Sequence, residues 1–315
     1  MSNHQFGEFF YTKSKNKARK GVVMNKNYTF GVMQGRLLPK YNGRYQAHPV
    51  GTWQQEFYIA QQLGLNTIEF ILDYEDAAKN PLMSKEGLEQ IRNISEQTGV
   101  AVKTVCADYF MQAPLHTVSK DEIEASIATL RKLIANCSAI GVTDIVIPLV
   151  DQSSMKTASS KQEFIENIRP LIPLAERYSI NLALETDLAP QEFAGLLASL
   201  DSKQITVNYD TGNSASLGYD IRQEFAAYGN RISSIHIKDR IRGGSSVVLG
   251  NGNTDFDVFF ECLRSCNFNK LFIMQAYRDE EGLNIFKQQL EWIKVKLNHC
   301  YAKRGSHHGY STYSR

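Results

Sequence analysis

The sequence lacks several features that would place it in a specialised class of proteins. Its 35 basic and 33 acidic residues give a formal net charge of +2, so neither sign is in strong excess. No apolar run reaches transmembrane length, and the first residues lack the apolar core of a signal peptide. These absences argue against a dedicated nucleic-acid or membrane surface. We therefore predict a cytoplasmic protein with neither nucleic acid nor membrane as a partner.

Cysteine is scarce, and its distribution does not indicate a disulfide framework. There are five cysteines, an odd number, and most of them lie inside apolar periodic segments. Cys262 and Cys266 are four residues apart, but no second Cys or His pair follows at the spacing of a zinc finger. Buried free thiols in a reducing compartment are the favoured interpretation.

Motifs that bind nucleotides or activate a serine are missing as well. The first apolar segment is followed by GVMQGRLLP, which lacks the GxGxxG spacing of a dinucleotide-binding turn. There is no P-loop and no arrangement that suggests a Ser-His-Asp triad. No Pro/Gly/Ser-rich linker interrupts residues 28–300, so these residues are expected to form one domain.

What the sequence does have is an alternation of strand and helix signals that repeats eight times. This number of units in about 270 residues is typical of a single (β/α)₈ TIM barrel, with a doubly wound open α/β sheet as the alternative. Residues 1–27 and 301–315 are polar and aperiodic, and we expect flexible terminal extensions there. The predicted strands are Tyr28–Met33, Thr67–Leu72, Val100–Ala107, Asp144–Leu149, Asn181–Glu185, Ile205–Asp210, Ile232–Ile237 and Lys270–Gln275.

Several predicted helices have recognisable ends. Ser119 and Glu122 have the spacing of a capping box, and so do Thr52 and Gln55. Gly99 is expected to end the helix that follows Ser84, because glycine readily adopts the left-handed conformation of a helix C-terminus.

Four polar residues lie at or near the ends of successive predicted strands in the second half of the chain: Glu185, Asp210, His236 and Gln275. In a parallel barrel the carboxyl ends of the strands open onto one site. Two carboxylates, an imidazole and an amide oxygen would meet there as ligands for a divalent metal. Taken singly, each has an ordinary alternative: a salt bridge for Glu185, a turn cap for Asp210 and a core position for His236.

Gln275 is the unusual member of this set. Its amide oxygen can coordinate a metal more weakly than a carboxylate, and it cannot accept a proton near neutral pH. Its alternative role is a hydrogen bond that orients Glu185 or the substrate.

Further polar residues on or after the predicted strands are candidates for substrate binding by the same geometric rule. The segment 243–252 contains four glycines and is expected to be a mobile loop over the site. The candidate substrate-binding residues are Gln34, Arg36, Glu69, Lys103, Asp108, Asn213, Lys238 and Arg242.

Three segments carry a resemblance to a known family: the strand LALET, the turn DTGN, and IHIKD followed by VVLGNGNTDFD. Over residues 28–297 the chain resembles the xylose isomerase-like superfamily of sugar-phosphate isomerases and epimerases. The segments GVMQGRL, CADYF and ETD resemble an uncharacterised branch of it. The resemblance implies a site for Mn²⁺, Mg²⁺, Co²⁺ or Zn²⁺ formed by a Glu, an Asp, a His and a second Glu. Glu185, Asp210 and His236 match the first three, and Gln275 stands in place of the second Glu.

The resulting hypothesis is a metal-dependent isomerase or epimerase of a small sugar, sugar phosphate or related polyol. Glu185 would remove the proton α to a carbonyl and form an enediolate. Without a second base at Gln275, 1,2-isomerisation is easier to explain than epimerisation, which would need an acid such as Glu69, Asp108 or Lys103. A dehydratase (lyase) that uses the same site and a non-catalytic sugar-binding protein are the alternatives. Whether the protein forms a homo-oligomer stays open.

Overall fold

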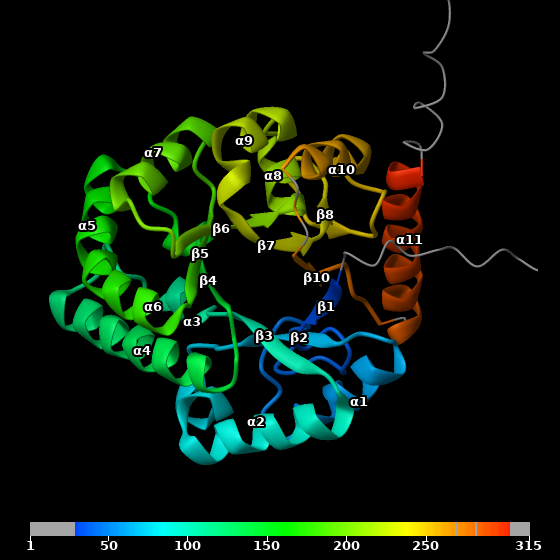
Figure 1. The fold of residues 1–315 in the computed structure, drawn as a ribbon, viewed down its shortest axis with the longest axis horizontal. Helices are drawn as coiled ribbons and strands as arrows, with labels where there is room; N and C mark the ends of the chain where they lie inside the picture. Colours follow the sequence, from blue (N-terminus) through cyan, green and yellow to red (C-terminus); the bar gives the residue numbers. More distant parts are fainter. Residues whose placement is uncertain (1–28, 267, 269, 281, 303–315) are drawn as a thin grey trace, which may run out of the picture.

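A closed barrel of eight parallel strands forms the centre of the computed structural model, which describes residues 29–266, 268, 270–280 and 282–302 (Figure 1). The order around the ring is β1-β10-β7-β6-β5-β4-β3-β2. The predicted (β/α)₈ barrel is therefore confirmed, and the open sheet is wrong. The strands are β1 (Thr29–Met33), β2 (Thr67–Ile71), β3 (Ala101–Cys106), β4 (Asp144–Leu149), β5 (Asn181–Thr186), β6 (Ile205–Asp210), β7 (Ile232–Ile237) and β10 (Leu271–Met274).

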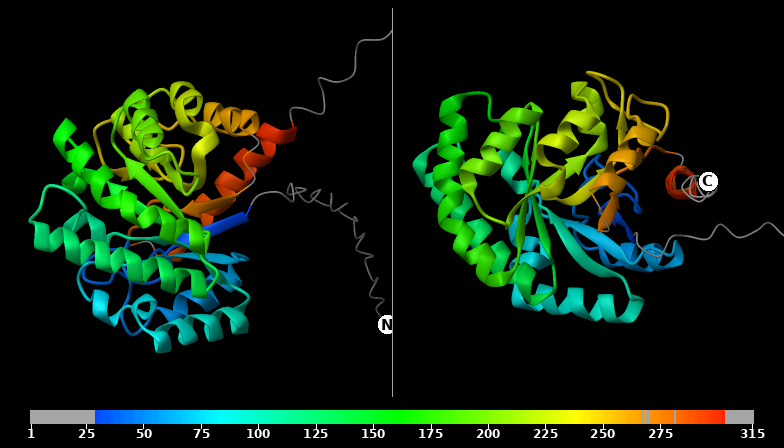
Figure 2. Two further views of the ribbon diagram at one scale, coloured as in Figure 1. Left: turned by 60° about the vertical axis from the view of Figure 1, so that its left-hand side comes forward. Right: turned by 45° about the horizontal axis from the view of Figure 1, so that its top comes forward.

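Helices surround the barrel on its outside (Figure 2). They are α1 (Gln54–Gln62), α2 (Lys85–Thr98), α3 (Tyr109–Gln112), α4 (Lys120–Ala139), α5 (Ala158–Ile168), α6 (Ile172–Tyr178), α7 (Pro190–Leu200), α8 (Thr211–Leu217), α9 (Ile221–Tyr228), α10 (Phe256–Ser265) and α11 (Leu283–Ala302). Short 3-10 turns are η1 (Ala77–Lys79), η2 (Pro81–Met83), η3 (Asp151–Ser153), η4 (Arg169–Leu171) and η5 (Gly229–Arg231). A two-stranded antiparallel sheet joins β8 (Asp239–Arg240) to β9 (Ser246–Val247).

At the C-terminal end, the structure differs from the expected boundary by two residues. α11 continues to Ala302, although the C-terminal extension was predicted from residue 301. The predicted N-terminal extension, residues 1–27, and residues 303–315 lie outside the described residues. Within the described ranges, no helix combines the length and the apolar character needed to cross a membrane.

The strands are apolar because both of their faces are buried. Their outer faces pack against the helices in one continuous core, and a second, smaller cluster fills the inside of the barrel. Burial on two faces explains why the strands are near-continuous apolar runs rather than alternating patterns. The interior cluster is Met33, Ile71, Cys106, Val146, Ala183 and Ile273.

The predicted helix ends are partly confirmed. The Ser119–Glu122 capping box is present, and Ser84 and Gly99 flank α2, with Gly99 at φ 70°. The Thr52–Gln55 capping box is wrong, because α1 begins after Trp53 without a side-chain cap. The Thr52 hydroxyl instead donates to the carbonyl oxygen of Pro49 at 3.4 Å.

Two irregularities in the strand register decide which side chains enter the barrel. Between β2 and β3, Ile68 pairs with Val102 and Glu69 pairs with Thr104, so Lys103 is the extra residue of a bulge. Between β6 and β7, the register shifts between Val207 and Asn208. Bulges of this kind re-aim side chains near functional sites, and the two here lie beside two polar residues of the site, Glu69 and Asn208.

Candidate metal centre and active site

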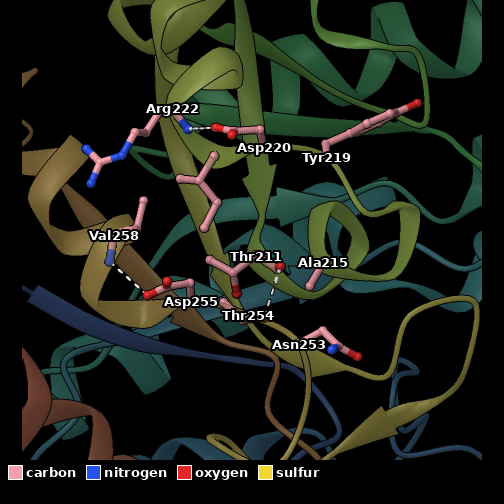
Figure 3. A pocket seen from close by; sticks show the side chains of 10 residues that line it. Thr211, Ala215, Tyr219, Asp220, Arg222, Asn253, Thr254, Asp255 and Val258 are labelled. Atoms are coloured by element: carbon pink, nitrogen blue, oxygen red, sulfur yellow. Dashed lines mark hydrogen bonds between the residues drawn. The ribbon is translucent and has the colours of Figure 1, made fainter.

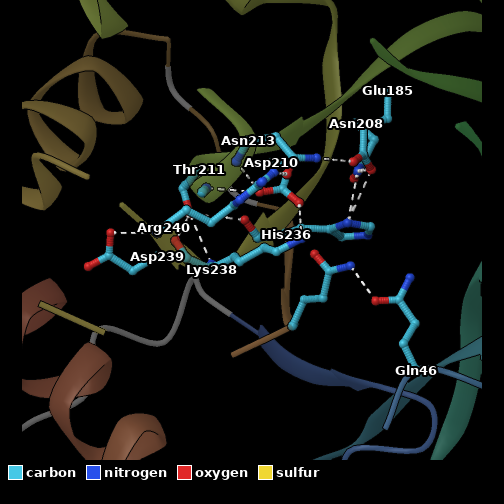
Figure 4. Close-up of polar contacts among 12 residues, drawn as sticks. Gln46, Glu185, Asn208, Asp210, Thr211, Asn213, His236, Lys238, Asp239 and Arg240 are labelled. Carbon is cyan, nitrogen blue, oxygen red and sulfur yellow. Dashed lines mark hydrogen bonds and ion pairs between the residues drawn. The ribbon is translucent and has the colours of Figure 1, made fainter. Parts of the chain in front are cut away.

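Glu185, Asp210 and His236 come together at the carboxyl ends of β5, β6 and β7. Each offers one ligand atom, and these atoms all lie within 4.8 Å of one another. All three residues are buried, and Figure 4 shows His236 beside Glu185. The structure thus places the three residues close enough to share one divalent cation, as the sequence predicted.

Two asparagine side chains hold the carboxylate of Glu185. Asn213 Nδ2 donates to Oε1 at 2.6 Å, and Asn208 Nδ2 donates to Oε2 at 2.7 Å. Asn213 is itself held by Arg240, whose Nη1 donates to Asn213 Oδ1 at 2.9 Å. Sequence reasoning missed Asn208. The signal was its position two residues before Asp210, which places both side chains on the same face of β6.

The two carboxylate oxygens of Asp210 have different partners. Oδ1 accepts hydrogen bonds from the backbone N–H groups of Gly212 and Asn213, both at 2.8 Å, and so caps α8. Oδ2 lies 3.5 Å from Lys238 Nζ. The turn cap uses Oδ1 and leaves Oδ2 available as a ligand atom, so the turn-cap role and a ligand role are compatible.

His236 is held between two carboxylates. Its Nε2 lies 2.7 Å from Glu69 Oε1 on β2, and its Nδ1 lies 3.3 Å from Glu185 Oε2. Burial of the imidazole opposes its protonation, but the carboxylates of Glu69 and Glu185 outweigh it and hold the pKa of His236 well above the usual value. Glu69 was predicted to bind substrate, and the structure instead makes it the partner that orients His236 from within the barrel.

Gln275 belongs to a separate chain of hydrogen bonds across the mouth. Its Nε2 donates to Gln46 Oε1 at 2.7 Å, and Gln46 Nε2 donates to Asp108 Oδ2 at 3.0 Å. Arg36 Nη2 also donates to Gln46 Oε1, at 3.2 Å. Gln46 was not among the predicted site residues, since it lies in the long segment between β1 and α1, where no periodic pattern marks it.

The residues present fit a divalent metal ion. Their donors are the carboxylates of Glu185 and Asp210 and the imidazole of His236, a set that suits several divalent ions. The Oε1 atom of Gln275 is buried and has no hydrogen-bond partner among the described residues. A buried acceptor of this kind is costly unless something satisfies it, so it is available as a weak fourth ligand.

The remaining candidates on the first strands lie at three different places. Gln34 directly follows β1, and its side chain accepts a hydrogen bond from Ile71 N at the end of β2 at 2.9 Å. Arg36 is half-buried beside Gln46, and desolvation together with the charge of Arg278 lowers its pKa to about 10. Lys103 is not brought to the site: it is exposed as the bulged residue of β3, and its Nζ donates to Gly141 O at 3.3 Å.

In the segment after β7, the arginine that reaches the site is Arg240 rather than the predicted Arg242. Arg242 is exposed, and its backbone N–H donates to the Asn253 side chain at 2.8 Å. Lys238 is the predicted residue that does lie at the site, beside Asp210.

The glycine-rich segment 243–252 is tethered rather than free of contacts. Oδ2 of Asp239 accepts hydrogen bonds from Gly250 N and Gly252 N, each at 2.9 Å, and Oδ1 accepts one from Thr254 N at 3.0 Å. A Cβ atom on Gly252 would lie 2.2 Å from Asp239 Oδ1. Glycine is therefore needed here for a close approach to the carboxylate, in addition to any mobility of the segment.

A cavity of about 230 Å³ is lined by Thr211 and lies among α8, α9 and the start of α10 (Figure 3). Its polar lining groups already have partners. Thr254 Oγ1 donates to Thr211 O at 3.2 Å, while Asp220 and Asp255 cap α9 and α10. The polar groups around this cavity therefore serve to cap helices, and they are separate from the metal cluster.

Comparison with known proteins agrees with this geometry. Residues 57–296 match the family model described as xylose isomerase-like TIM barrel. The chain belongs to this family. A Haemophilus influenzae protein with the provisional name L-ribulose-5-phosphate 3-epimerase is 24% identical over 264 residues, which are 78% of this chain and 92% of that protein. An inosose dehydratase of Geobacillus thermodenitrificans is 24% identical over 167 residues, 46% of this chain and 56% of that protein.

Solved structures share the fold. The structure of an L-ribulose 3-epimerase superimposes with a TM-score of 0.68 at 15% identity, covering 90% of this chain and 99% of that one. The IOLI protein with a bound zinc atom superimposes with a TM-score of 0.64 at 15% identity, covering 88% and 98%. At such low identity the likeness establishes the architecture and leaves the chemistry to the residues of the site.

Proposed function

We propose that this chain is a metal-dependent sugar epimerase or isomerase that removes a proton α to a carbonyl group. The observation that carries the proposal is the position of Glu185, a buried carboxylate at a candidate metal cluster whose two oxygens are both held by asparagine amides. A carboxylate fixed in this way is suited to act as a general base. The substrate would be a small ketose, a ketose phosphate or a related polyol.

The metal ligands would be Glu185, Asp210 and His236, with Gln275 Oε1 as a weaker fourth. When bound, a divalent ion would polarise the substrate carbonyl and stabilise negative charge that develops next to it. The zinc atom in the IOLI protein, which has the same fold, supports a metal in this protein. Mn²⁺, Mg²⁺, Co²⁺ and Zn²⁺ are all compatible with this mixture of oxygen and nitrogen donors.

The chain's own cations would act on the same charge. Lys238 Nζ lies beside Asp210, and Arg36 is half-buried next to Gln46 with a lowered pKa that still leaves it charged near neutral pH. Both would stabilise an enediolate as it forms. Arg240 would act through Asn213, which it holds against Glu185.

A phosphate group on the substrate is the finer part of the proposal. Lys238 and Arg240 follow β7 in close succession, and two cations at the mouth suit an anionic substituent. The name of the Haemophilus relative, which refers to a ketose 5-phosphate, supports the same substrate class.

The test has two stages. Metal content is measured on protein purified without chelator, and we expect about one divalent ion per chain. The loaded protein is then incubated in D₂O with ketoses and ketose phosphates, and NMR should detect deuterium at the carbon next to the carbonyl. An unsaturated or deoxy product would identify a dehydratase instead. Binding without deuterium uptake would indicate a non-catalytic sugar-binding protein and would refute the proposal.

A further inference from the structure

Inversion at a carbon atom requires a proton donor on the face opposite to the base, and Gln275 cannot be that donor because an amide does not titrate near neutral pH. We propose that Asp108 protonates the enediolate on the face opposite to Glu185, which makes the reaction an epimerisation. This inference rests on the proposed function, since it assigns the second proton transfer of the same reaction.

The other two acids considered from the sequence are placed elsewhere. Glu69 is fully buried inside the barrel, and its Oε1 lies 2.7 Å from His236 Nε2, so this carboxylate already supports a candidate metal ligand. Lys103 is bulged out of β3, and its ammonium group contacts the carbonyl of Gly141, which precedes β4 at the opposite end of the barrel from the site. Asp108 follows the carboxyl end of β3, which is the end that holds the site.

The side chain of Asp108 is bonded into the site and not into the helix that it precedes. As the residue before α3 it could have capped that helix, but its side chain makes no capping hydrogen bond. Its Oδ2 accepts from Gln46, and the same amide group accepts from Gln275 through Oε1. One amide group therefore separates Asp108 from Gln275.

The surroundings of Asp108 favour a carboxyl group that can exchange a proton. Its two hydrogen-bonding partners, the amide of Gln46 and the thiol of Cys106 at 3.1 Å from Oδ1, are both neutral. Desolvation by the surrounding protein raises the pKa of Asp108 to about 6, close to the range in which a general acid and base works best. Asp108 as a residue is half-buried at the carboxyl end of β3.

The proton balance of the reaction is complete with these two groups. Glu185 takes the proton from the carbon atom and leaves the electron pair in an enediolate. Protonated Asp108 then gives its proton to the same carbon from the other face, and the carbonyl re-forms. Glu185 ends protonated and Asp108 ionised, and exchange with water restores both.

The test is Asp108→Asn, which keeps an oxygen that can accept from Gln46 but cannot donate a carboxylic proton. The probe is L-ribulose 5-phosphate, or whichever ketose of the panel the wild type labels, in D₂O with metal-loaded protein. We expect epimer formation to fall by about 10²–10⁴-fold, while Glu185 still introduces deuterium into the substrate with retained configuration. Asp151→Asn is the matched control, because Asp151 is an exposed aspartate after β4 with φ 51°, a conformation that asparagine tolerates.

Three results would overturn the assignment of Asp108. They are an undiminished rate of epimer formation, a parallel loss of deuterium uptake and epimer formation at full metal occupancy, and a wild type that labels its substrate but forms only the 1,2-isomer. If the wild type itself takes up no deuterium with any member of the panel, the proposed function has failed first, and the two failures are thus distinguishable.

Discussion

The two sides of the barrel mouth hold their polar groups in different ways. The metal side, defined by Glu185, Asp210 and His236, comes from three consecutive strands and is charged. The amide side, defined by Gln275, Gln46 and Asp108, is drawn from distant segments and is joined by two amide groups. The first side combines carboxylates with an imidazole, whereas the second has one carboxyl group, two amides and the Arg36 guanidinium that donates to Gln46.

In the pattern that the chain resembles, a second glutamate would stand in place of Gln275 and would add another carboxylate to the metal side. Carboxylates gathered on the metal side repel one another unless a cation lies between them. Amides on the other side add no charge, so they can line the substrate without raising that repulsion. Proton transfer on the amide side then depends on Asp108, which gives the reaction two dissimilar acid–base groups.

The largest expected effect is the loss of the base on the metal side. Glu185→Gln should reduce deuterium exchange by about 10²–10⁴-fold, because the remaining groups near the substrate do not replace its carboxylate. NMR of the substrate in D₂O measures the rate, and Asp151→Asn is the control. Exchange at the wild-type rate in the Glu185→Gln protein would show that a different base does the chemistry.

A smaller effect is expected from the residue that orients the metal ligand. Glu69→Gln should weaken metal binding by about 10–100-fold, since partners behind a ligating histidine contribute on that scale. Isothermal titration with Mn²⁺ gives the affinity, and thermal unfolding without metal shows whether the barrel is intact. Glu75→Gln, an exposed glutamate beyond β2, is the matched control. Unchanged affinity in the Glu69 variant would mean that His236 needs no support from β2.

Replacing the amide of Gln275 by a carboxylate should strengthen metal binding, whereas the Glu69 variant weakens it. Gln275→Glu should tighten metal binding by about tenfold, equivalent to about 1.4 kcal/mol, because it adds one negative ligand. A carboxylate there cannot donate to Gln46 Oε1, so the Gln46 amide must turn and release its bond to Asp108. Metal titration and the rate of epimer formation at several pH values report the two consequences. Weaker metal binding would place Gln275 outside the ligand set.

A separate effect, on the stability of the fold and not on the reaction, concerns the anchor of the segment that carries Gln46. Glu56 is fully buried, accepts from Leu37 N at 3.0 Å, and has its pKa raised to about 7 by desolvation. A raised pKa means that its stabilising contribution is present at low pH and is lost as the pH rises from about 4.5 to 7. The stability of Glu56→Gln relative to wild type should therefore improve by up to roughly 3 kcal/mol between pH 5 and pH 8. Urea unfolding at both pH values measures it, and a pH-independent difference would contradict the prediction.

Most of the metal side could be predicted from the sequence because its residues follow one rule. Glu185, Asp210 and His236 lie at or near the ends of buried strands, and the closed barrel brings neighbouring strand ends together. The strands themselves were recognisable because burial on both faces leaves long apolar runs. Asn208 could have been found by the same alternation, since it is two residues from Asp210 on β6.

The amide side could not be predicted, because it depends on long-range contacts and on register. Gln46 meets Gln275, 229 residues away in the sequence, and Asp108, 62 residues away. The position of Lys103 was predicted incorrectly because one bulge in β3 turns it outward and puts Thr104 in its place. A single-residue shift reverses the face of every following side chain, and no pattern in the sequence marks where it occurs.

By itself, the sequence determined the alternation of strands and helices, and with it the strand ends where Glu185, Asp210 and His236 meet. These depend on local hydrophobic periodicity, which any stretch of the chain carries within itself. Only the tertiary structure decided that Glu69 supports His236 and that Gln46 links Gln275 to Asp108. These contacts require closure of the ring and one particular register between strands, both of which are set by the packing of the whole barrel.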